Sequence, residues 1–272
     1  MILSAAEKNR LKQKYGPWAV VTGASSGIGL ELAERLAESG INLILNARTT
    51  ADLETAKDKI TAVHPVEIKL VAADLAKLEN VDQLLAEIKD VNVGLFIASA
   101  GFGTSGLFMN AVLADELAMM HVNCDALMAL TLHFSQRFAQ KKRGGIILLS
   151  SMVAFQGVPF AANYSATKAY VQSLAEAIAV ELKPYGVDVL AAAPGPVASG
   201  FAKRADMVMS MSLTPAEVGI PILKALGRQS TVLPGFLTKL LVGSLRTVPR
   251  WGKVQIMKLV MGGMTKHQPN VL

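Results

Sequence analysis

The fold is decided by the stretch Trp18-Ala19-Val20-Val21-Thr22-Gly23-Ala24-Ser25-Ser26-Gly27-Ile28-Gly29, which is followed by a helical pattern over residues 30–38. Its apolar start predicts a β-strand, its glycines a turn, and the segment after them a helix. Glycine lacks a Cβ, so such a turn admits positive φ angles and lets a pyrophosphate reach backbone N–H groups at the positive end of a helix. This order indicates a dinucleotide site, although three glycines can also simply punctuate a loop.

Strands and helices alternate along the rest of the chain. Nearly continuous apolar strands separated by helices specify an α/β fold with a doubly wound parallel sheet covered on both faces. Ligands of such sheets bind beyond the carboxyl ends of the strands. The expected strands are 42–45, 67–72, 93–98, 145–149, 187–192 and 231–234, and the expected helices are 49–62, 81–89, 111–139, 161–182 and one that begins at Thr214.

Arg48 follows the second expected strand, where a dinucleotide fold addresses the adenosine ribose. An acid at this place binds the 2′-hydroxyl group of NAD, whereas an arginine accommodates the 2′-phosphate of NADP. Because no acid precedes Arg48, the sequence favours NADP(H) over NAD(H). The alternative is an exposed arginine that opens the next helix.

Tyr164 and Lys168 stand four positions apart on an expected helix and therefore share a face. A fixed ammonium group beside a phenol lowers the phenol pKa from its ordinary value of about 10, which favours proton transfer to a substrate oxygen. Ser151 follows the buried run 145–150, so its hydroxyl is expected at the end of a strand, where it can hold a carbonyl. The alternative is a core tyrosine, a solvated lysine and a turn serine.

The bulk composition indicates one domain in a reducing compartment. The chain has 272 residues, of which 51% are hydrophobic, enough for one large core. The single cysteine, Cys124, excludes an internal disulfide, and the charged start of the chain lacks the apolar core of a signal peptide. No continuous apolar run approaches the roughly 18 residues of a membrane span. A cytoplasmic protein is expected, with no transmembrane helix.

The formal charge of +6 is concentrated at the C-terminal end, because eight basic and no acidic residues occur from Gly219 onward. Nucleic-acid binding is not expected, since no recognition module accompanies them. We expect residues 1–234 to form the dinucleotide-binding domain and residues 235–272 a basic amphipathic extension of it. That extension could lie on an anionic membrane surface, on the body of the protein or on a partner subunit.

The methionines of one segment and the histidines of the chain are further candidates for binding roles. The segment 203–212 is rich in methionine, and flexible thioethers suit an adaptable apolar lid, although core filling explains them nearly as well. No metal site is expected, because the histidines show no ligand spacing with Cys124 or with one another. The residues concerned are Met207, Met209 and Met211, and His64, His121, His133 and His267.

Taken together, these residues resemble the short-chain dehydrogenase/reductases, in their single-domain branch. The resemblance spans about residues 15–235 and implies a Rossmann sheet of about seven strands in a three-layer α/β/α arrangement. It also implies hydride exchange between a nicotinamide and a carbonyl or alcohol carbon. The matching motifs are Thr22 to Gly29, Asp74, Ala98-Ser99-Ala100-Gly101, Asn123, Ser151, Tyr164, Lys168 and Pro194-Gly195.

The resemblance also implies roles for individual residues. Tyr164 would donate or accept the proton, Lys168 would lower its pKa and hold the nicotinamide ribose, and Ser151 would orient the substrate oxygen. Asn123 would keep a water molecule in a proton relay. The cofactor would lie against Gly23, Ser25, Ser26, Gly27, Ile28 and Gly29, against Arg48, Asp74 and Leu75, against Ser99, Ala100 and Gly101, and against Pro194, Gly195, Val197 and Ser199.

Two departures from the family pattern are visible. Ala98-Ser99 stands where the family usually has two asparagines, which removes amide groups near the cofactor, and Ser199 stands where threonine is common. The extension after Leu233 is similar to that of long-chain 3-oxoacyl and hydroxysteroid reductases. Relatives pair into dimers or tetramers through helices corresponding to 111–139 and 161–182.

The leading hypothesis is an NADP(H)-dependent carbonyl reductase or alcohol dehydrogenase with an apolar ketone or alcohol substrate. Its substrate specificity would come from loops 103–113, 152–160 and 203–212. Two alternatives use the same fold without catalysis, a sensor of NADP(H) and a scaffold at a membrane surface. A sensor typically lacks the tyrosine or the lysine, and this chain retains both.

Overall fold

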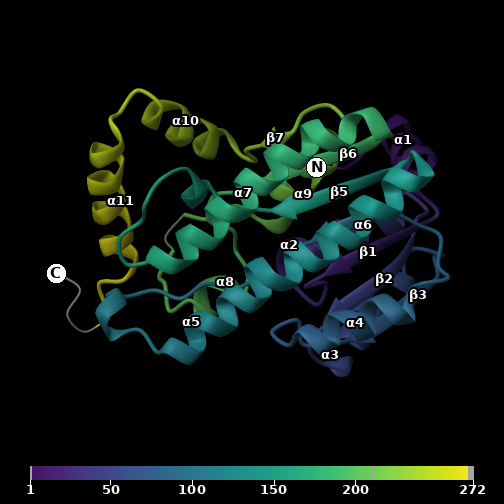
Figure 1. Cartoon of the computed structure of the whole chain (residues 1–272), viewed down its shortest axis with the longest axis horizontal. Helices are drawn as coiled ribbons and strands as arrows, with labels where there is room; N and C mark the ends of the chain where they lie inside the picture. Colours follow the sequence, from purple (N-terminus) through teal and green to yellow (C-terminus); the bar gives the residue numbers. More distant parts are fainter. Residues whose placement is uncertain (1, 210, 269–272) are drawn as a thin grey trace.

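A computed structural model describes residues 2–209 and 211–268 (Figure 1). Met1, Ser210 and residues 269–272, which belong to the expected domain, lid and extension, lie outside the described residues. The described chain forms one seven-stranded sheet in the order β3-β2-β1-β4-β5-β6-β7, and every neighbouring pair is parallel. The strands are β1 Trp18–Thr22, β2 Asn42–Ala47, β3 Ile68–Ala72, β4 Val93–Ala98, β5 Gly144–Leu149, β6 Val187–Ala192 and β7 Thr231–Val232.

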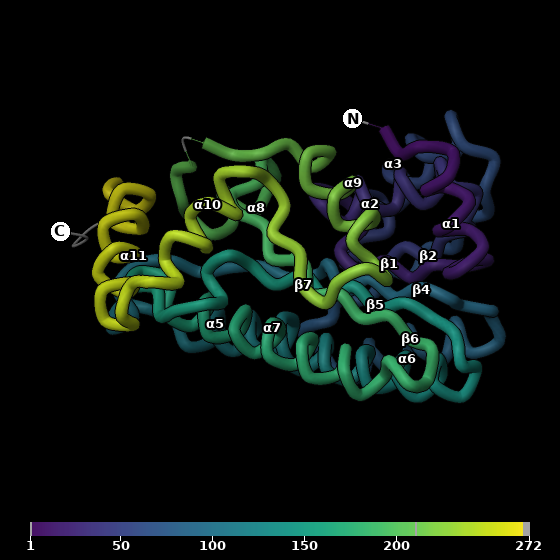
Figure 2. The backbone as a smooth tube through the Cα atoms, turned by 90° about the horizontal axis from the view of Figure 1, so that it is seen from above, coloured from purple at the N-terminus to yellow at the C-terminus, as the bar shows by residue number. Residues whose placement is uncertain are grey.

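Helices cover both faces of this sheet, which gives three layers (Figure 2). One face packs on α1 Ala5–Tyr15, α2 Gly27–Glu38, α3 Thr50–Thr61 and α9 Pro215–Ala225. The opposite face packs on α4 Leu78–Glu87, α6 Leu127–Lys141 and α7 Ala162–Leu182. The predicted Rossmann-type α/β/α fold is therefore confirmed, and it places the carboxyl ends of the strands along one edge.

The predicted helix 111–139 differs from the observed one in its middle. The observed segment begins as α5 Leu113–Met120, passes through a π-helical turn, His121–Ala126, and continues as α6. Single π-helical turns occur within α-helices and are frequent at functional sites. Apolar periodicity did not predict this turn, because it does not distinguish one π-helical turn from the α-helix around it.

The helix that runs from Leu113 to Lys141 is the one described segment whose length and composition would allow a membrane span. Its mean hydropathy reaches 1.2 over the best window, of which 39% is buried. That this helix is apolar enough for a membrane span was not predicted, because polar residues interrupt its apolar runs. Leu130, Phe134 and Phe138 of this helix are buried against the sheet, which is the packing expected of a core helix.

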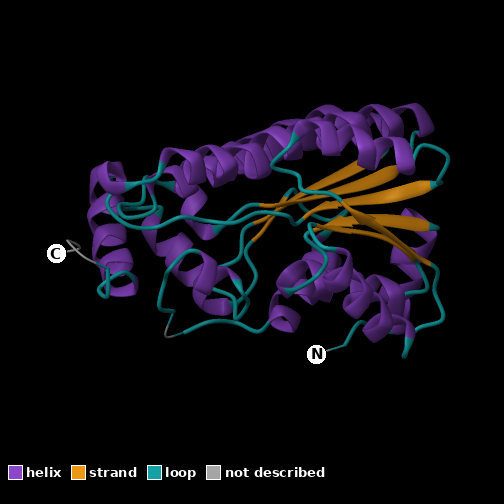
Figure 3. Ribbon diagram, turned by 90° about the horizontal axis from the view of Figure 1, so that it is seen from below, coloured by secondary structure: helices purple, strands orange, loops and turns teal. Residues whose placement is uncertain are grey.

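Two helices end the described chain, α10 Phe236–Leu245 and α11 Arg250–Met264. In Figures 1 and 3 they lie at the end of the molecule beyond the carboxyl ends of the strands. Met257 and Met261 of α11 pack in a third apolar cluster with Val158 and Phe160, and the Val208 N–H donates to the Met264 carbonyl at 2.9 Å. One side of the extension thus packs on the body of the protein.

Candidate active site

The predicted glycine turn is present between β1 and α2. Gly23 and Gly27 have φ angles of +64° and +59°, which favour glycine. A Cβ added to Gly29 would lie 2.3 Å from the Gly23 carbonyl oxygen, and one added to Gly23 would lie 2.8 Å from the backbone of Ala100. A side chain at either position would clash with neighbouring backbone, so this tight turn at the start of α2 requires glycine, as a dinucleotide-binding turn does.

Thr22 fixes the loop that faces this turn across the sheet. Its Oγ1 accepts hydrogen bonds from the Ser99 and Ala100 N–H groups, both at 3.1 Å, and donates to the Ile97 carbonyl at 3.4 Å. The chain therefore holds the β4 loop in place with a threonine hydroxyl, although the family's usual asparagines are absent. This role of Thr22 was not predicted. Its hydroxyl at the end of β1 was the one feature of the sequence that could have indicated it.

One end of the cavity contains Arg48 and Asp74, which the sequence predicts to meet the adenosine. Arg48 is exposed and forms no ion pair with a described residue. Asn46 is buried and donates to the Val71 and Ala73 carbonyls at 3.0 and 3.1 Å, so no carboxylate ends β2. Asp52, which the sequence analysis did not consider, also lines this end of the cavity.

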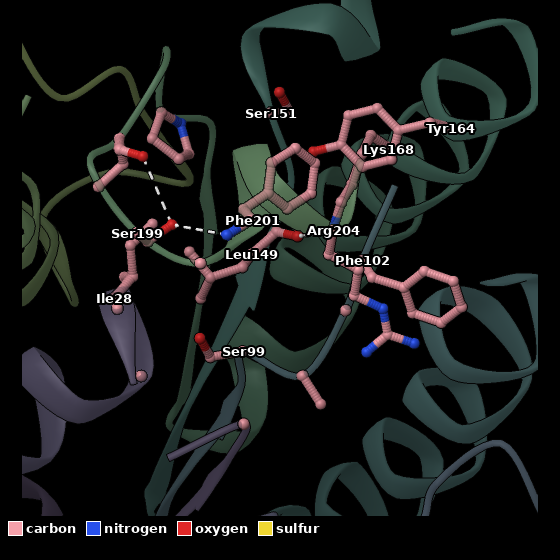
Figure 4. Close-up of a pocket in the computed structure, with 18 of the residues that line it drawn as sticks. Ile28, Ser99, Phe102, Leu149, Ser151, Tyr164, Lys168, Ser199, Phe201 and Arg204 are labelled. Atoms are coloured by element: carbon pink, nitrogen blue, oxygen red, sulfur yellow. Dashed lines mark hydrogen bonds between the residues drawn. The ribbon is translucent and has the colours of Figure 1, made fainter. Parts of the chain in front are cut away.

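The predicted catalytic side chains converge at the carboxyl end of β5 (Figure 4). Ser151 is the second residue after the strand, and Tyr164 and Lys168 lie in the first two turns of α7. The Lys168 Nζ lies 5.9 Å from the centroid of the Tyr164 ring and donates to the Leu149 carbonyl at 2.8 Å. Both side chains are buried, so the interpretation of a solvated lysine is wrong.

The electrostatics of this group differ from the prediction in one respect. Burial raises the pKa of Tyr164 to about 12, and the hydrogen bond with the Ser151 hydroxyl acts in the opposite direction. Burial also lowers the pKa of Lys168 to about 8. Lys168 therefore does not bring the pKa of Tyr164 below 10, because desolvation dominates. The phenol remains protonated at neutral pH and can donate its proton.

Asn123 lies in the π-helical turn and is completely buried. Its Oδ1 accepts from the Phe102 N–H at 3.1 Å, while its Nδ2 donates to the Phe102 carbonyl at 2.9 Å and to the Thr167 Oγ1 at 3.1 Å. The side chain therefore joins the β4 loop to α7. One lone pair of Oδ1 remains, so its role in holding a water stays a prediction.

A cavity of about 840 Å³ joins the glycine turn to the catalytic side chains. Every residue predicted to bind the cofactor lines it, as do Ser151, Tyr164 and Lys168, whereas the buried Asn123 lies behind its wall. At the carboxamide end, the Ser199 hydroxyl donates to the Val197 carbonyl at 3.4 Å and accepts from the Phe201 N–H at 3.4 Å. The structure thus brings together the parts that the sequence predicted separately.

The wall beside Tyr164 is apolar and rich in methionine. It includes the predicted Met207, Met209 and Met211, and the short helix α8 Phe201–Arg204 adds Phe201, whose ring centroid is 5.2 Å from that of Tyr164. The contribution of α10 and α11 to this wall was not predicted, because their apolar series does not show which part of the protein each side of a helix faces. They add Leu237, Leu241, Met257, Val260, Met261 and Met264.

The described residues contain no cluster of histidine, cysteine and carboxylate side chains that could hold a metal ion. Cys124 is partly buried, and burial raises the pKa of its thiol. A thiol of raised pKa is a poor nucleophile. Neither observation adds a second reactive centre within the described part of the chain.

This fold and this site define the class of protein. The family model for short chain dehydrogenases matches residues 17–208, and the chain belongs to that family. This is a family of oxidoreductases that bind a nicotinamide cofactor.

Similar proteins of known activity share about a third or less of their residues with this chain over the matched length. The chain is 27% identical over 232 residues to a 7beta-hydroxysteroid dehydrogenase from Mediterraneibacter gnavus, covering 83% of this chain and 88% of that protein. It is 36% identical over 179 residues to a very-long-chain 3-oxoacyl-CoA reductase from Emericella nidulans, covering 64% and 52%.

Two solved structures share the fold. A structure of 7beta-hydroxysteroid dehydrogenase has a TM-score of 0.84 at 26% identity and covers 91% of this chain and 98% of its own. A short-chain dehydrogenase from Sphingobium yanoikuyae in complex with NADPH has a TM-score of 0.78, also at 26% identity, and covers 86% and 97%.

Proposed function

We propose that this protein is an NADP(H)-dependent oxidoreductase that interconverts a carbonyl group and a secondary alcohol on an apolar substrate. The observation that carries the proposal is the buried group of Ser151, Tyr164 and Lys168, which opens into the same cavity as the glycine turn. When bound, the nicotinamide would supply or accept the hydride. The chain itself must then bind the substrate oxygen and move one proton.

The catalytic residues would divide this work. The Ser151 hydroxyl orients the substrate oxygen, and the Tyr164 hydroxyl gives that oxygen its proton during reduction and removes it during oxidation. Burial keeps Tyr164 protonated, with a pKa raised to about 12, which suits an acid in the reductive direction. The Lys168 ammonium, held by the Leu149 carbonyl, supplies positive charge that favours the phenolate as the proton leaves.

The preference for NADP(H) rests on the adenosine end of the cavity. Arg48 is an exposed cation without an ion pair among the described residues, and it can bind a 2′-phosphate. The buried Asn46 supplies no carboxylate for a ribose diol. Asp52 opposes this preference in part, because it places a negative charge at the same end of the cavity. The neighbour that holds NADPH supports the same assignment.

The apolar wall beside Tyr164 supports a bulky apolar ketone as substrate, and thioether side chains can adapt to its shape. Two proteins of similar structure support the same class of substrate, a 7beta-hydroxysteroid dehydrogenase and a bulky-bulky ketone specific alcohol dehydrogenase from Comamonas testosteroni. We further propose a homodimer or homotetramer, because α6 and α7 expose Leu132 and Val180.

The test is Tyr164→Phe, which removes only the phenolic oxygen. The variant should bind NADPH as the wild type does, in a fluorescence titration, while its oxidation of NADPH with a panel of bulky ketones falls by at least about 100-fold. Tyr170→Phe, on the half-exposed side of the same helix, is the matched control and should retain turnover. Undiminished turnover in Tyr164→Phe would remove this residue from the mechanism. Absence of turnover in the wild type, with NADPH still bound, would favour the sensor.

A further inference from the structure

The last two helices present an apolar surface to solvent. Phe236 and Leu240 of α10 are 81% and 54% exposed, and Trp251 and Leu259 of α11 are 74% and 79% exposed. Together with Ile256 we call these residues the outer face. Large apolar side chains gathered on neighbouring helices at this density are a mark of an interaction surface rather than of ordinary surface composition.

The outer face adjoins the opening of the catalytic cavity. Leu237, Leu241 and Val260 each line that cavity and are also 46%, 41% and 45% exposed, so they lie at its mouth. On the inward side of α11, Met257 and Met261 are buried and line the interior of the cavity. A continuous apolar path therefore leads from the outer face through the mouth toward Tyr164.

The same two helices and the residues next to them are strongly basic. The segment from Phe236 to Lys266 has six basic and no acidic residues, and none of the six forms an ion pair with a described residue. Asp206 approaches this segment and bonds to His267 at 3.0 Å, not to a lysine or arginine. The six are Lys239, Arg246, Arg250, Lys253, Lys258 and Lys266.

We propose that the outer face docks on an anionic lipid bilayer, with the mouth of the cavity against the lipid, so that an apolar ketone dissolved in the bilayer enters the site from there. Exposed Trp, Phe and Leu beside free Lys and Arg are the chemistry of helices that lie in a membrane interface. α10 is an apolar helix of ten residues and α11 has fifteen, so both are too short to span and are suited to lie on the surface.

Charge distinguishes this occupant from a second copy of the chain. A two-fold interface would bring together two copies of a segment that holds six cations and no acidic residue to pair with them. Like charges across an interface oppose association. An anionic bilayer, in contrast, offers each cation a lipid phosphate and each apolar side chain the acyl boundary.

The experiment is flotation of the full-length protein with two kinds of vesicle, one of phosphatidylcholine alone and one of phosphatidylcholine mixed with phosphatidylglycerol. The wild type should float with the mixed vesicles and bind the neutral ones much more weakly. Lys239→Gln, Arg246→Gln and Lys258→Gln combined should lower the partition coefficient on mixed vesicles by about 100-fold, since each cation near such a surface contributes about fivefold. Lys77→Gln, Lys89→Gln and Lys183→Gln, exposed lysines elsewhere, form the control and should bind like the wild type.

The apolar contribution is tested separately. Phe236→Ala, Trp251→Ala and Leu259→Ala combined do not alter the lining of the cavity, and should lower partition on mixed vesicles by at least about 100-fold. Val63→Ala, Leu78→Ala and Tyr185→Ala remove exposed apolar side chains elsewhere and should have no such effect. Circular dichroism and thermal unfolding check that each variant folds.

Three outcomes would overturn the docking proposal: no flotation of the wild type, equal binding to neutral and mixed vesicles, or unchanged binding in both sets of outer-face variants. If the wild type instead forms a dimer in solution that the apolar variants dissociate, and does not float, the outer face binds a second copy.

The entry of substrate rests on the proposed reductase function and is measured independently of docking. Turnover of a bulky ketone embedded in mixed vesicles should fall about tenfold or more in the apolar variant, while turnover of a water-soluble ketone stays unchanged. Flotation without any turnover of either ketone would contradict the proposed function and leave docking intact. Flotation with equal turnover of both ketones by wild type and variant would overturn entry from the bilayer.

Discussion

Replacement of Thr22 by valine tests whether one hydroxyl organises the cofactor loop. Thr22 is 1% exposed, and its Oγ1 is the acceptor for the Ser99 and Ala100 N–H groups. Valine has the same shape but accepts nothing, so two partly buried donors lose their partner. At about 1 kcal/mol for each, Thr22→Val should lower the free energy of unfolding by about 2 kcal/mol. That corresponds to a melting temperature about 4–8 °C lower.

The matched control is Thr131→Val in α6. Thr131 is 3% exposed, but its Oγ1 has no hydrogen-bond partner in the described structure. Removing an unsatisfied buried hydroxyl costs nothing in hydrogen bonding, so this variant should be as stable as the wild type or slightly more stable. The pair therefore separates the effect of two lost hydrogen bonds from the effect of a threonine-to-valine change in the core.

Chemical denaturation of both variants measures the effect on stability, and a titration with NADPH measures the effect on the site. Because Ser99 and Ala100 line the cofactor cavity, Thr22→Val should also weaken NADPH binding by about tenfold, which corresponds to roughly 1.4 kcal/mol. If Thr22→Val unfolds within about 0.5 kcal/mol of Thr131→Val and binds NADPH normally, the hydroxyl does not hold the loop and this reasoning is wrong.

Three further predictions follow from the site. Burial lowers the pKa of Lys168 to about 8 and raises that of Tyr164 to about 12, so the phenol stays protonated while the ammonium loses its charge as pH rises. A pH profile of kcat/KM for ketone reduction should therefore be level below about pH 8 and fall above it, and a level profile to pH 10 would exclude Lys168 from that step. Arg48→Gln should raise the KM for NADPH by about tenfold or more and leave that for NADH nearly unchanged, whereas an equal change in both would contradict a role in binding the 2′-phosphate. Gly29→Ala places a Cβ 2.3 Å from the Gly23 carbonyl oxygen, so calorimetry should detect no NADPH binding, and normal affinity would show that the turn is more adaptable than its geometry indicates.

Local pattern was sufficient for much of the fold. The strand, turn and helix of residues 18–38 and the apolar run before Ser151 carry their own signal, because each depends on neighbours in sequence. The capping box of α9, in which Thr214 and Glu217 exchange hydrogen bonds, is a signal of the same kind. Parallel pairing then places the strand ends together, so the position of the site follows from the topology.

What the sequence could not supply depends on residues far apart in the chain. The high pKa of Tyr164 comes from burial under α8 and its neighbours, and the spacing to Lys168 alone suggested the opposite shift. The apolar series of α11 was visible, but only the folded chain shows that Met257 lines the cavity while Leu259 faces solvent. The periodicity of a helix says which residues share a side, not what that side meets.

The π-helical turn around Asn123 has a consequence for sequence alignment and protein engineering. A residue inserted into or deleted from a helix rotates everything downstream by about 100°. A π-helical turn holds one residue more than an α-helical turn, so a deletion within it restores regular geometry and leaves Phe134 and Phe138 of α6 against the sheet. A deletion between this turn and Phe134 has no such compensation and would turn both side chains away from the sheet. We therefore expect the start of α6 to tolerate no change in length, whereas a deletion within the turn should disturb only the local arrangement around Asn123.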